Sequence, residues 1–148
     1  MTYFDTSALI KYFVVEKGSD LAQRLVQAHS PTATGSITYA EVYSGLNRRK
    51  REGHISASQY ARLGRQFEEH WPSYIRIELV QEVLALAKFL LERHPLRALD
   101  AIHLASAISL KKGIHEPLQF AAADSRLLDA ASAEHLSPLN IETAKFKK

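Results

Sequence analysis

Four acidic residues occupy places in the sequence where a strand ends or a helix begins. Asp5 and Asp124 each follow a short apolar stretch that has the composition of a strand. Glu41 and Asp100 each stand early in a predicted helix. If the strands belong to an open α/β sheet, ligands bind at the edge where they end. Carboxylates crowded there repel one another unless some are protonated or a cation lies between them, so the pattern predicts a metal site.

The ligand type predicts which metal and which chemistry. Carboxylate oxygens suit Mg²⁺ or Mn²⁺ better than zinc or copper. A hydrated Mg²⁺ held by carboxylates commonly serves phosphate chemistry, because the ion lowers the pKa of a bound water and polarises the phosphoryl oxygen. Thr6 and Ser7 follow Asp5 directly and offer hydroxyls that would orient a water or a phosphate oxygen. The sequence leaves open whether one ion or two are needed.

Two of the acids have competing structural interpretations of unequal strength. Thr38 and Glu41 form a Thr-x-x-Glu pattern before an apolar run, which is typical of a capping box. Asp5 has a weaker structural interpretation, because Thr6 and Ser7 already offer caps for the helix that follows it. Taken together with the other acids, Asp5 is therefore the stronger candidate for chemistry.

The other two acids also have structural alternatives. Asp124 is a good N-cap for the helix after it, and Asp100 in a first turn would be stabilised by the helix dipole. His103 lies on the same side of its helix as Asp100, so the two would make a metal pair. A histidine in such a helix is more commonly hydrogen-bonded within the fold, and we favour that interpretation for His103.

Predicted strands and helices alternate along the chain. We expect strands at 2–4, 32–37, 75–79, 119–123 and 139–141, and helices at 6–15, 21–29, 38–52, 56–71, 83–91, 98–111 and 125–133. Alternation of this kind predicts an α/β fold with three α/β/α layers around a short-stranded, mainly parallel sheet. A length of 148 residues suits a single domain, 1–148.

Composition excludes several classes of protein. A hydrophobic content of 46% excludes a disordered chain, and the apolar stretches are too short to span a membrane. The N-terminus shows no signal peptide. The absence of cysteine rules out disulfides and thiolate metal sites, and is consistent with a cytoplasmic protein.

Basic residues gather in two places on a chain whose net charge is only +3. One cluster lies mid-chain and the other at the C-terminus: Arg48, Arg49, Lys50 and Arg51, then Lys145, Lys147 and Lys148. Such a run is commonly a solvated helix face, and we expect the C-terminal lysines to be a frayed tail. A basic cluster beside an acidic site also suits a polyanionic substrate, so the mid-chain cluster is a candidate RNA-binding element.

Four segments, in this order and spacing, resemble the PIN-domain ribonucleases, and most closely the VapC-type toxins of toxin–antitoxin pairs. The segments are FDTSAL at 4–9, TYAEV at 38–42, LRALDAIHLA at 96–105 and FAAADSRL at 120–127. The resemblance covers nearly the whole chain and implies a PIN-like fold.

The resemblance also implies roles for individual residues. It implies an acidic pocket for Mg²⁺ or Mn²⁺, with Asp5 and Asp100 as the most direct ligands. Glu41 and Asp124 would complete the pocket, often through water. Thr6 and Ser7 match the polar residues beside the first acid. Ala123 departs from the pattern, which often has Thr or Ser there, and this makes the role of Asp124 less defined.

The implied activity is endonucleolytic cleavage of single-stranded or looped RNA by a toxin that forms a homodimer and is neutralised by an antitoxin. One alternative is a catalytically silent RNA- or protein-binding module of the same fold. A phosphatase of the haloacid-dehalogenase kind is disfavoured, because its second Asp is replaced here by Ser7. The RNA target is not encoded in any motif that we identify.

Overall fold

A parallel sheet of five short strands forms the centre of the molecule. A computed structural model describes residues 1–145, so Lys147 and Lys148 of the predicted tail lie outside the described residues. The strands are β1 (Thr2–Phe4), β2 (Thr32–Gly35), β3 (Ile75–Ile77), β4 (Gln119–Ala122) and β5 (Ser137–Asn140). Their order is β3-β2-β1-β4-β5, and every neighbouring pair is parallel. The predicted α/β fold with a parallel sheet is confirmed.

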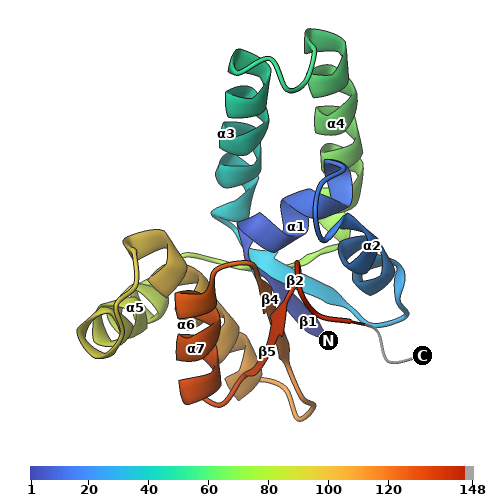
Figure 1. Cartoon of the computed structure of the whole chain (residues 1–148). Helices are drawn as coiled ribbons and strands as arrows, with labels where there is room; N and C mark the ends of the chain where they lie inside the picture. The colour runs from blue at the N-terminus through green and yellow to red at the C-terminus, as the bar shows by residue number, and fades with distance from the viewer. Residues whose placement is uncertain (146–148) are drawn as a thin grey trace.

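Helices cover both faces of the sheet (Figure 1). On one side lie α1 (Thr6–Phe13), α2 (Ser19–Gln27), α3 (Thr38–Arg51) and α4 (Ala57–His70), which is followed by the 3₁₀ turn η1 (Trp71–Ser73). On the other side lie α5 (Gln81–Arg93), α6 (Ala98–Lys112) and α7 (Ser125–Ala133). No helix among residues 1–145 has both the length and the apolarity needed to cross a membrane.

Successive residues of the central strands alternate between two apolar cores, because side chains of a strand point to opposite faces of the sheet. Tyr3 packs into the core beneath α5, α6 and α7, whereas Phe4 packs into the core beneath α1 to α4. In β4, Phe120 faces the first core and Ala121 the second. This alternation accounts for the apolar sequence of both strands, which are buried on both faces.

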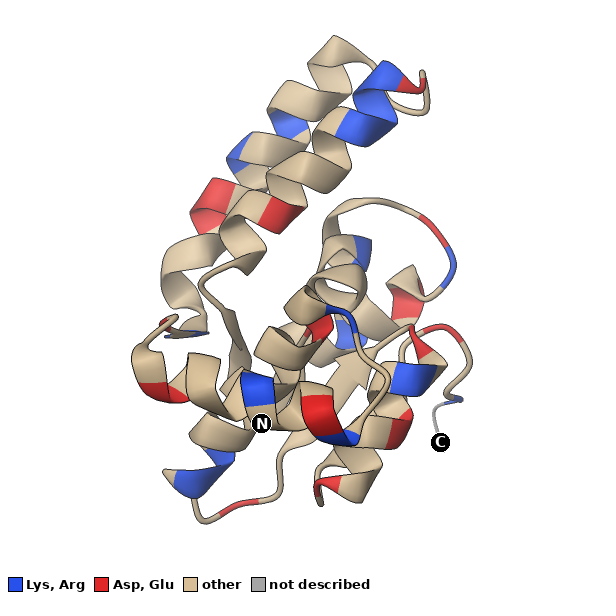
Figure 2. Cartoon of the chain, turned by 90° about the vertical axis from the view of Figure 1, so that its left-hand side faces the viewer, with Lys and Arg blue, Asp and Glu red and all other residues tan. Residues whose placement is uncertain are grey.

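Helices α3 and α4 form a hairpin that projects from the sheet (Figure 1). Its base is anchored in the core by Val42, Leu46 and Phe67, all fully buried. Helix α4 begins with a capping box between Ser56 and Gln59. The basic residues of α3 occupy its last turn, near the tip of the hairpin (Figure 2).

Some predicted boundaries were wrong by two residues. β2 ends at Gly35 rather than at 37, because the chain turns there into α3. β5 begins at Ser137 rather than at 139, with Pro138 paired to Phe120. A proline is tolerated in β5 because this is an edge strand of the sheet.

Candidate active site

Asp5 lies directly after β1, where the central strands β1 and β4 end side by side. It is the N-cap of α1: its Oδ1 accepts a hydrogen bond of 2.9 Å from the Ala8 backbone N–H. The prediction that Thr6 or Ser7 caps this helix is wrong, because both lie inside the first turn. The Ser7 hydroxyl instead donates to Asp5, 2.8 Å from Oδ1 and 3.0 Å from Oδ2.

The carboxyl group of Asp5 is buried, with the residue only 4% exposed. Burial raises its pKa to about 6, although the charge of His103 and the hydrogen bonds from Ser7 and Ala8 lower it in part. The negative charge of Asp100 raises the pKa further. This repulsion by Asp100 is the smallest of these effects on the pKa of Asp5.

Glu41 faces the same region from α3. The predicted capping box is wrong: the N-cap is Ile37, and no side chain caps this helix. The Glu41 Oε1 accepts a hydrogen bond of 2.7 Å from the Thr6 hydroxyl. Thr38 is also engaged elsewhere, with its hydroxyl 2.8 Å from that of Thr34 in β2. Tertiary partners have therefore replaced the local pairing that the sequence pattern suggests.

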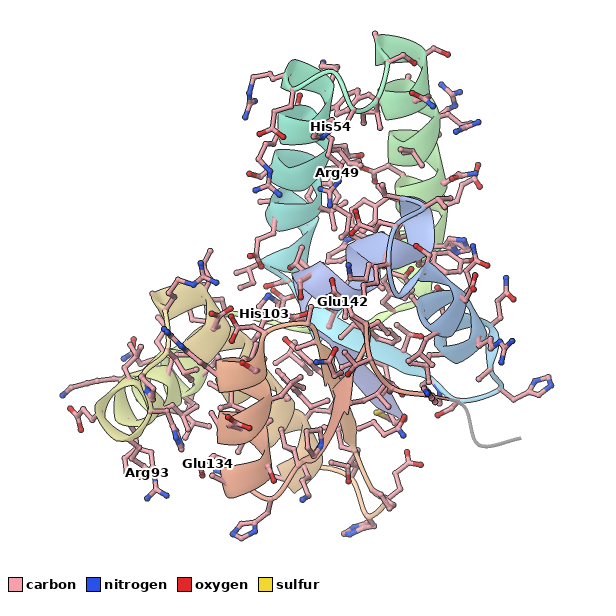
Figure 3. The ribbon with its side chains drawn as sticks, in the orientation of Figure 1. Arg49, His54, Arg93, His103, Glu134 and Glu142 are labelled. Carbon is pink, nitrogen blue, oxygen red and sulfur yellow. The ribbon has the colours of Figure 1, made fainter. Side chains whose placement is uncertain are left out.

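His103 of α6, labelled in Figure 3, is buried, and both of its ring nitrogens have polar partners. Its Nε2 lies 2.7 Å from the Glu41 Oε1, and its Nδ1 lies 2.8 Å from the Tyr3 hydroxyl. Burial acts to raise the pKa of Glu41, but the hydrogen bond and charge of His103, with help from Thr6, bring it below its usual value. The interpretation of His103 as hydrogen-bonded within the fold is confirmed.

Asp100 and Asp124 are connected by an arginine that the sequence analysis did not single out. Arg97, the N-cap residue of α6, places its Nε 3.4 Å from the Asp100 Oδ2 and its Nη2 3.8 Å from the Asp124 Oδ2. Asp124 also caps α7, since its Oδ1 accepts hydrogen bonds from the backbone N–H groups of Arg126 and Leu127. Asp124 therefore has the structural role that the sequence suggests, with its second oxygen turned toward Arg97.

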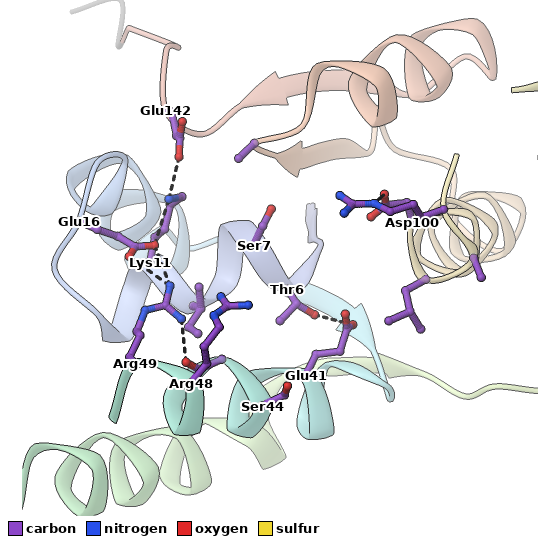
Figure 4. A pocket seen from close by; sticks show the side chains of 16 residues that line it. Thr6, Ser7, Lys11, Glu16, Glu41, Ser44, Arg48, Arg49, Asp100 and Glu142 are labelled. Carbon is purple, nitrogen blue, oxygen red and sulfur yellow. Dashed lines mark hydrogen bonds and ion pairs between the residues drawn. The ribbon is translucent and has the colours of Figure 1, made fainter. Parts of the chain in front are cut away.

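A pocket of about 670 Å³ opens beside these residues. Its acidic end contains Glu41 and Asp100 together with the hydroxyls of Thr6 and Ser7 (Figure 4). Asp5 does not line the pocket: its carboxylate lies beneath Ser7, which does. Asp124 lies outside the lining as well. The structure thus brings Glu41 and Asp100 to one cavity, with Asp5 just below its surface.

The opposite end of the pocket is basic (Figure 4). Lys11 is almost fully buried there, with its Nζ 3.1 Å from Glu16 and 3.0 Å from Glu142. Arg49 pairs with the same Glu16 at 3.2 Å. This network joins α1, α3 and the segment after β5. Lys11 is a second pocket residue that the sequence analysis missed, because its position within an apolar helix carries no motif.

The four basic residues predicted to bind RNA point in different directions. Arg48 and Arg49 line the pocket, and no side-chain hydrogen bond or ion pair of Arg48 occurs among residues 1–145. Lys50 turns toward α4, with its Nζ 4.3 Å from the centre of the Tyr60 ring. Arg51 is exposed near the tip of the hairpin. Among these four residues, Arg48 alone lines the pocket without an ion pair within residues 1–145. Arg49 is paired with Glu16, Lys50 packs on Tyr60, and Arg51 points to solvent.

The donor set at the acidic end fits a hard divalent cation, since it consists of carboxylate and hydroxyl oxygens. However, no group of three or more His, Asp or Glu side chains within residues 1–145 is arranged so that it could hold a metal ion. Metal binding thus stays a prediction that requires Asp5, Glu41 or Asp100 to adjust.

The sequence is similar to one family of proteins along most of its length. The family described as PIN domain matches residues 2–133. Ribonuclease VapC45 from Mycobacterium tuberculosis is 34% identical over 110 residues, covering 74% of this chain and 76% of that protein. Ribonuclease VapC46 from the same organism is 33% identical over 130 residues, covering 87% and 88%.

A solved structure shows the same fold. A chain in a toxin–antitoxin complex from Klebsiella pneumoniae superposes with a TM-score of 0.65 at 20% identity. The match covers 95% of this chain and 98% of that one. Because only 20% of the residues are identical, this similarity shows a shared fold and nothing more.

Proposed function

The chain belongs to the PIN domain family, and from this premise we propose that it is an endoribonuclease that uses Mg²⁺ or Mn²⁺ to cleave RNA. One observation carries the proposal: the pocket where the parallel strands end is lined by Glu41 and Asp100 and lies directly above the buried Asp5. Relatives named as ribonucleases support the reaction class. The oxygen donors of Glu41, Asp100 and Asp5 support the proposed metal requirement.

Each residue of the acidic end has a proposed task. Asp5 and Asp100 would ligate the cation directly, and Glu41 would complete its surroundings. The Ser7 hydroxyl keeps the Asp5 carboxylate oriented, through contacts of 2.8 and 3.0 Å to its two oxygens. Bound Mg²⁺ or Mn²⁺ would supply an activated water and offset the negative charge of the phosphate. Thr6 holds Glu41 at 2.7 Å.

The basic end of the pocket supports an RNA substrate. Lys11, Arg48 and Arg49 line this end, within the same cavity as the acids. A phosphodiester chain crossing the pocket would place one phosphate at the acids and a neighbouring phosphate near Arg48. Lys11 and Arg49 already have carboxylate partners, so they contribute mainly by fixing the shape of the pocket.

We also propose that the protein is the toxin of a type II toxin–antitoxin pair, held inactive by a cognate antitoxin. A structural neighbour is a toxin–antitoxin complex, which supports this assignment. The predicted homodimer is consistent with exposed apolar side chains on and next to α5, among them Val80, Leu84 and Phe89. The predicted cytoplasmic location stays a prediction.

A cleavage assay tests the proposed reaction. Purified protein should cut single-stranded RNA in the presence of Mg²⁺, and EDTA should stop the reaction. Asp100→Asn should abolish cleavage, because it removes the carboxylate that faces the pocket. Asp129→Asn, an exposed position on α7, serves as the control and should cut normally. Full cleavage by both Asp5→Asn and Asp100→Asn would refute the metal assignment.

The silent binding module is the competing function. It is favoured by one observation, namely that no group of three metal-binding side chains is already arranged among residues 1–145. Calorimetry separates the two proposals. A silent module should show no Mg²⁺ or Mn²⁺ binding that depends on Asp100, whereas the nuclease should show binding that Asp100→Asn removes.

A further inference from the structure

The two carboxylate oxygens of Glu41 have different surroundings. Its Oε1 accepts the Thr6 hydroxyl at 2.7 Å and lies 2.7 Å from the His103 Nε2. No hydrogen bond or ion pair engages its Oε2 among the described residues. Since Glu41 lines the pocket and is only partly exposed, one oxygen is held by the protein and the other is free for a ligand.

The contact with Glu41 requires a proton on the Nε2 of His103. Glu41 is an acceptor only, so the His103 Nε2 must be the donor of that bond. In the neutral ring the Nδ1 is then an acceptor, and the Tyr3 hydroxyl donates to it at 2.8 Å. With either a neutral or a charged ring, Tyr3, His103 and Glu41 form one chain of hydrogen bonds in which His103 donates to Glu41.

This chain is buried and held rigidly. Tyr3 is fully buried in β1, and its ring stacks on that of Phe120 at 5.5 Å and 4°. Gly35 at the end of β2 lies near the Tyr3 hydroxyl, and a Cβ atom at Gly35 would approach that hydroxyl to 3.0 Å. The hydroxyl thus has space only because no side chain is present at this point. A fixed Tyr3 in turn fixes the plane of the His103 ring.

We propose that His103 is a positioning residue, which with Tyr3 holds Glu41 so that its free Oε2 faces the pocket as a ligand for the divalent cation. The proposal rests on the proposed function, because it concerns how one of the proposed ligands is held. Outer hydrogen-bond partners of this kind orient the groups that bind a metal, and their loss typically weakens metal affinity about 10- to 100-fold. Neither ring nitrogen of His103 is itself a ligand.

Two substitutions at the same position distinguish the Glu41 contact from the Tyr3 contact. His103→Asn ends its amide near the place of Nδ1, so it retains a partner for Tyr3 but cannot reach Glu41. His103→Gln extends its amide to the place of Nε2 and can donate to Glu41. Titration of each folded variant with Mn²⁺ by calorimetry measures metal affinity without any RNA. We expect His103→Asn to weaken Mn²⁺ binding about 10-fold or more, and His103→Gln to recover most of the loss.

The chain provides a matched control in a second, similar pair. His94 lies 2.8 Å from Glu134 through its Nε2, and both side chains are largely buried. This pair lies at the far ends of α5 and α7, away from His103 (Figure 3). His94→Asn removes the same kind of contact and should leave Mn²⁺ affinity unchanged. A general loss of stability would therefore not be mistaken for a loss of positioning.

The outcomes separate this inference from the proposed function. Mn²⁺ binding by folded His103→Asn equal to that of the wild type would overturn the positioning role and leave the nuclease intact. Absence of Mn²⁺ binding by the wild-type protein would overturn both proposals. If His103→Asn does not fold, Tyr3→Phe keeps the stacked ring and removes only the hydroxyl. Unchanged Mn²⁺ affinity in that variant would equally overturn the proposal, and a weakened affinity would support it.

Discussion

The guanidinium of Arg97 lies against the carboxylate of Asp100, with its Nε 3.4 Å from Oδ2. The same guanidinium reaches Asp124 at 3.8 Å. A positive group thus already bridges two of the four acids. Because the Arg97 side chain is 83% exposed, these contacts are weak and easily replaced.

Arg97→Gln should therefore strengthen the binding of a divalent cation in the absence of RNA. An exposed ion pair is worth about 0.2–1 kcal/mol, which corresponds to an increase in Mn²⁺ affinity of at most about 5-fold. Calorimetry on the two proteins measures this difference. Arg93→Gln breaks another pair formed by an exposed arginine, with Glu134, and provides the control. Weaker Mn²⁺ binding by Arg97→Gln would show that Arg97 supports the cation instead of competing with it.

Asp5→Asn should change how the stability of the metal-free protein depends on pH. The pKa of Asp5 is about 6 in the folded protein, above its ordinary value of 3.8. The folded state therefore binds this proton more tightly, so the contribution of Asp5 to stability is greatest below about pH 4 and is lost as the pH rises through about 6. Asn is neutral throughout and keeps an acceptor for the Ala8 N–H. At pH 7 the variant should be more stable, on the order of 3 kcal/mol.

Urea unfolding in EDTA at pH 4 and pH 7 measures this effect. The advantage of Asp5→Asn should be nearly absent at pH 4. Addition of Mg²⁺ at pH 7 should then stabilise the wild type and not the variant, because ligand binding to the folded state raises stability. If the variant and the wild type differ in unfolding free energy by the same amount at pH 4 and pH 7, burial does not raise the pKa of Asp5.

The alternation of strands and helices, and with it the parallel sheet, was predictable because the relevant signals are local. Apolar strands, each followed by a polar residue and a helix, place Asp5 and Asp124 at one edge of a parallel sheet. The boundaries of α7 are those predicted. Asp124 follows β4 closely and caps the helix, so the start of α7 can be read from neighbouring residues. Such features depend on residues within a few positions of one another.

Contacts between distant segments were not predictable in the same way. Glu41 matches a capping box, yet Thr6 and His103 are its partners, 35 and 62 positions away in the sequence. Tyr3 resembles any core aromatic residue until its hydroxyl is seen beside His103. Arg97 and Lys11 carry no motif, because their roles arise only when α6 and α1 pack beside other elements.

Lys11→Met should destabilise the protein. The Lys11 side chain is 7% exposed and joins Glu16 to Glu142, so its removal leaves two carboxylates near one another without their shared cation. Breaking a buried pair costs about 3–5 kcal/mol, and the partial exposure of both partners here places the expected loss near the lower end. Thermal or urea unfolding measures the loss. Lys88→Met, on the exposed side of α5, is the control.

Arg48→Gln should weaken RNA binding and reduce its dependence on salt. Arg48 lines the pocket and has no side-chain ion pair among residues 1–145, so it is available to contact a phosphate. One lost phosphate contact lowers the slope of log affinity against log salt by about 0.7 for a single strand. Binding of a non-cleaved RNA to the Asp100→Asn background, measured between low and moderate salt, gives this slope. Arg51→Gln, from the exposed end of the same helix, is the control and should leave the slope unchanged. If both substitutions lower the slope equally, the helix attracts RNA by its overall charge, and Arg48 makes no specific phosphate contact.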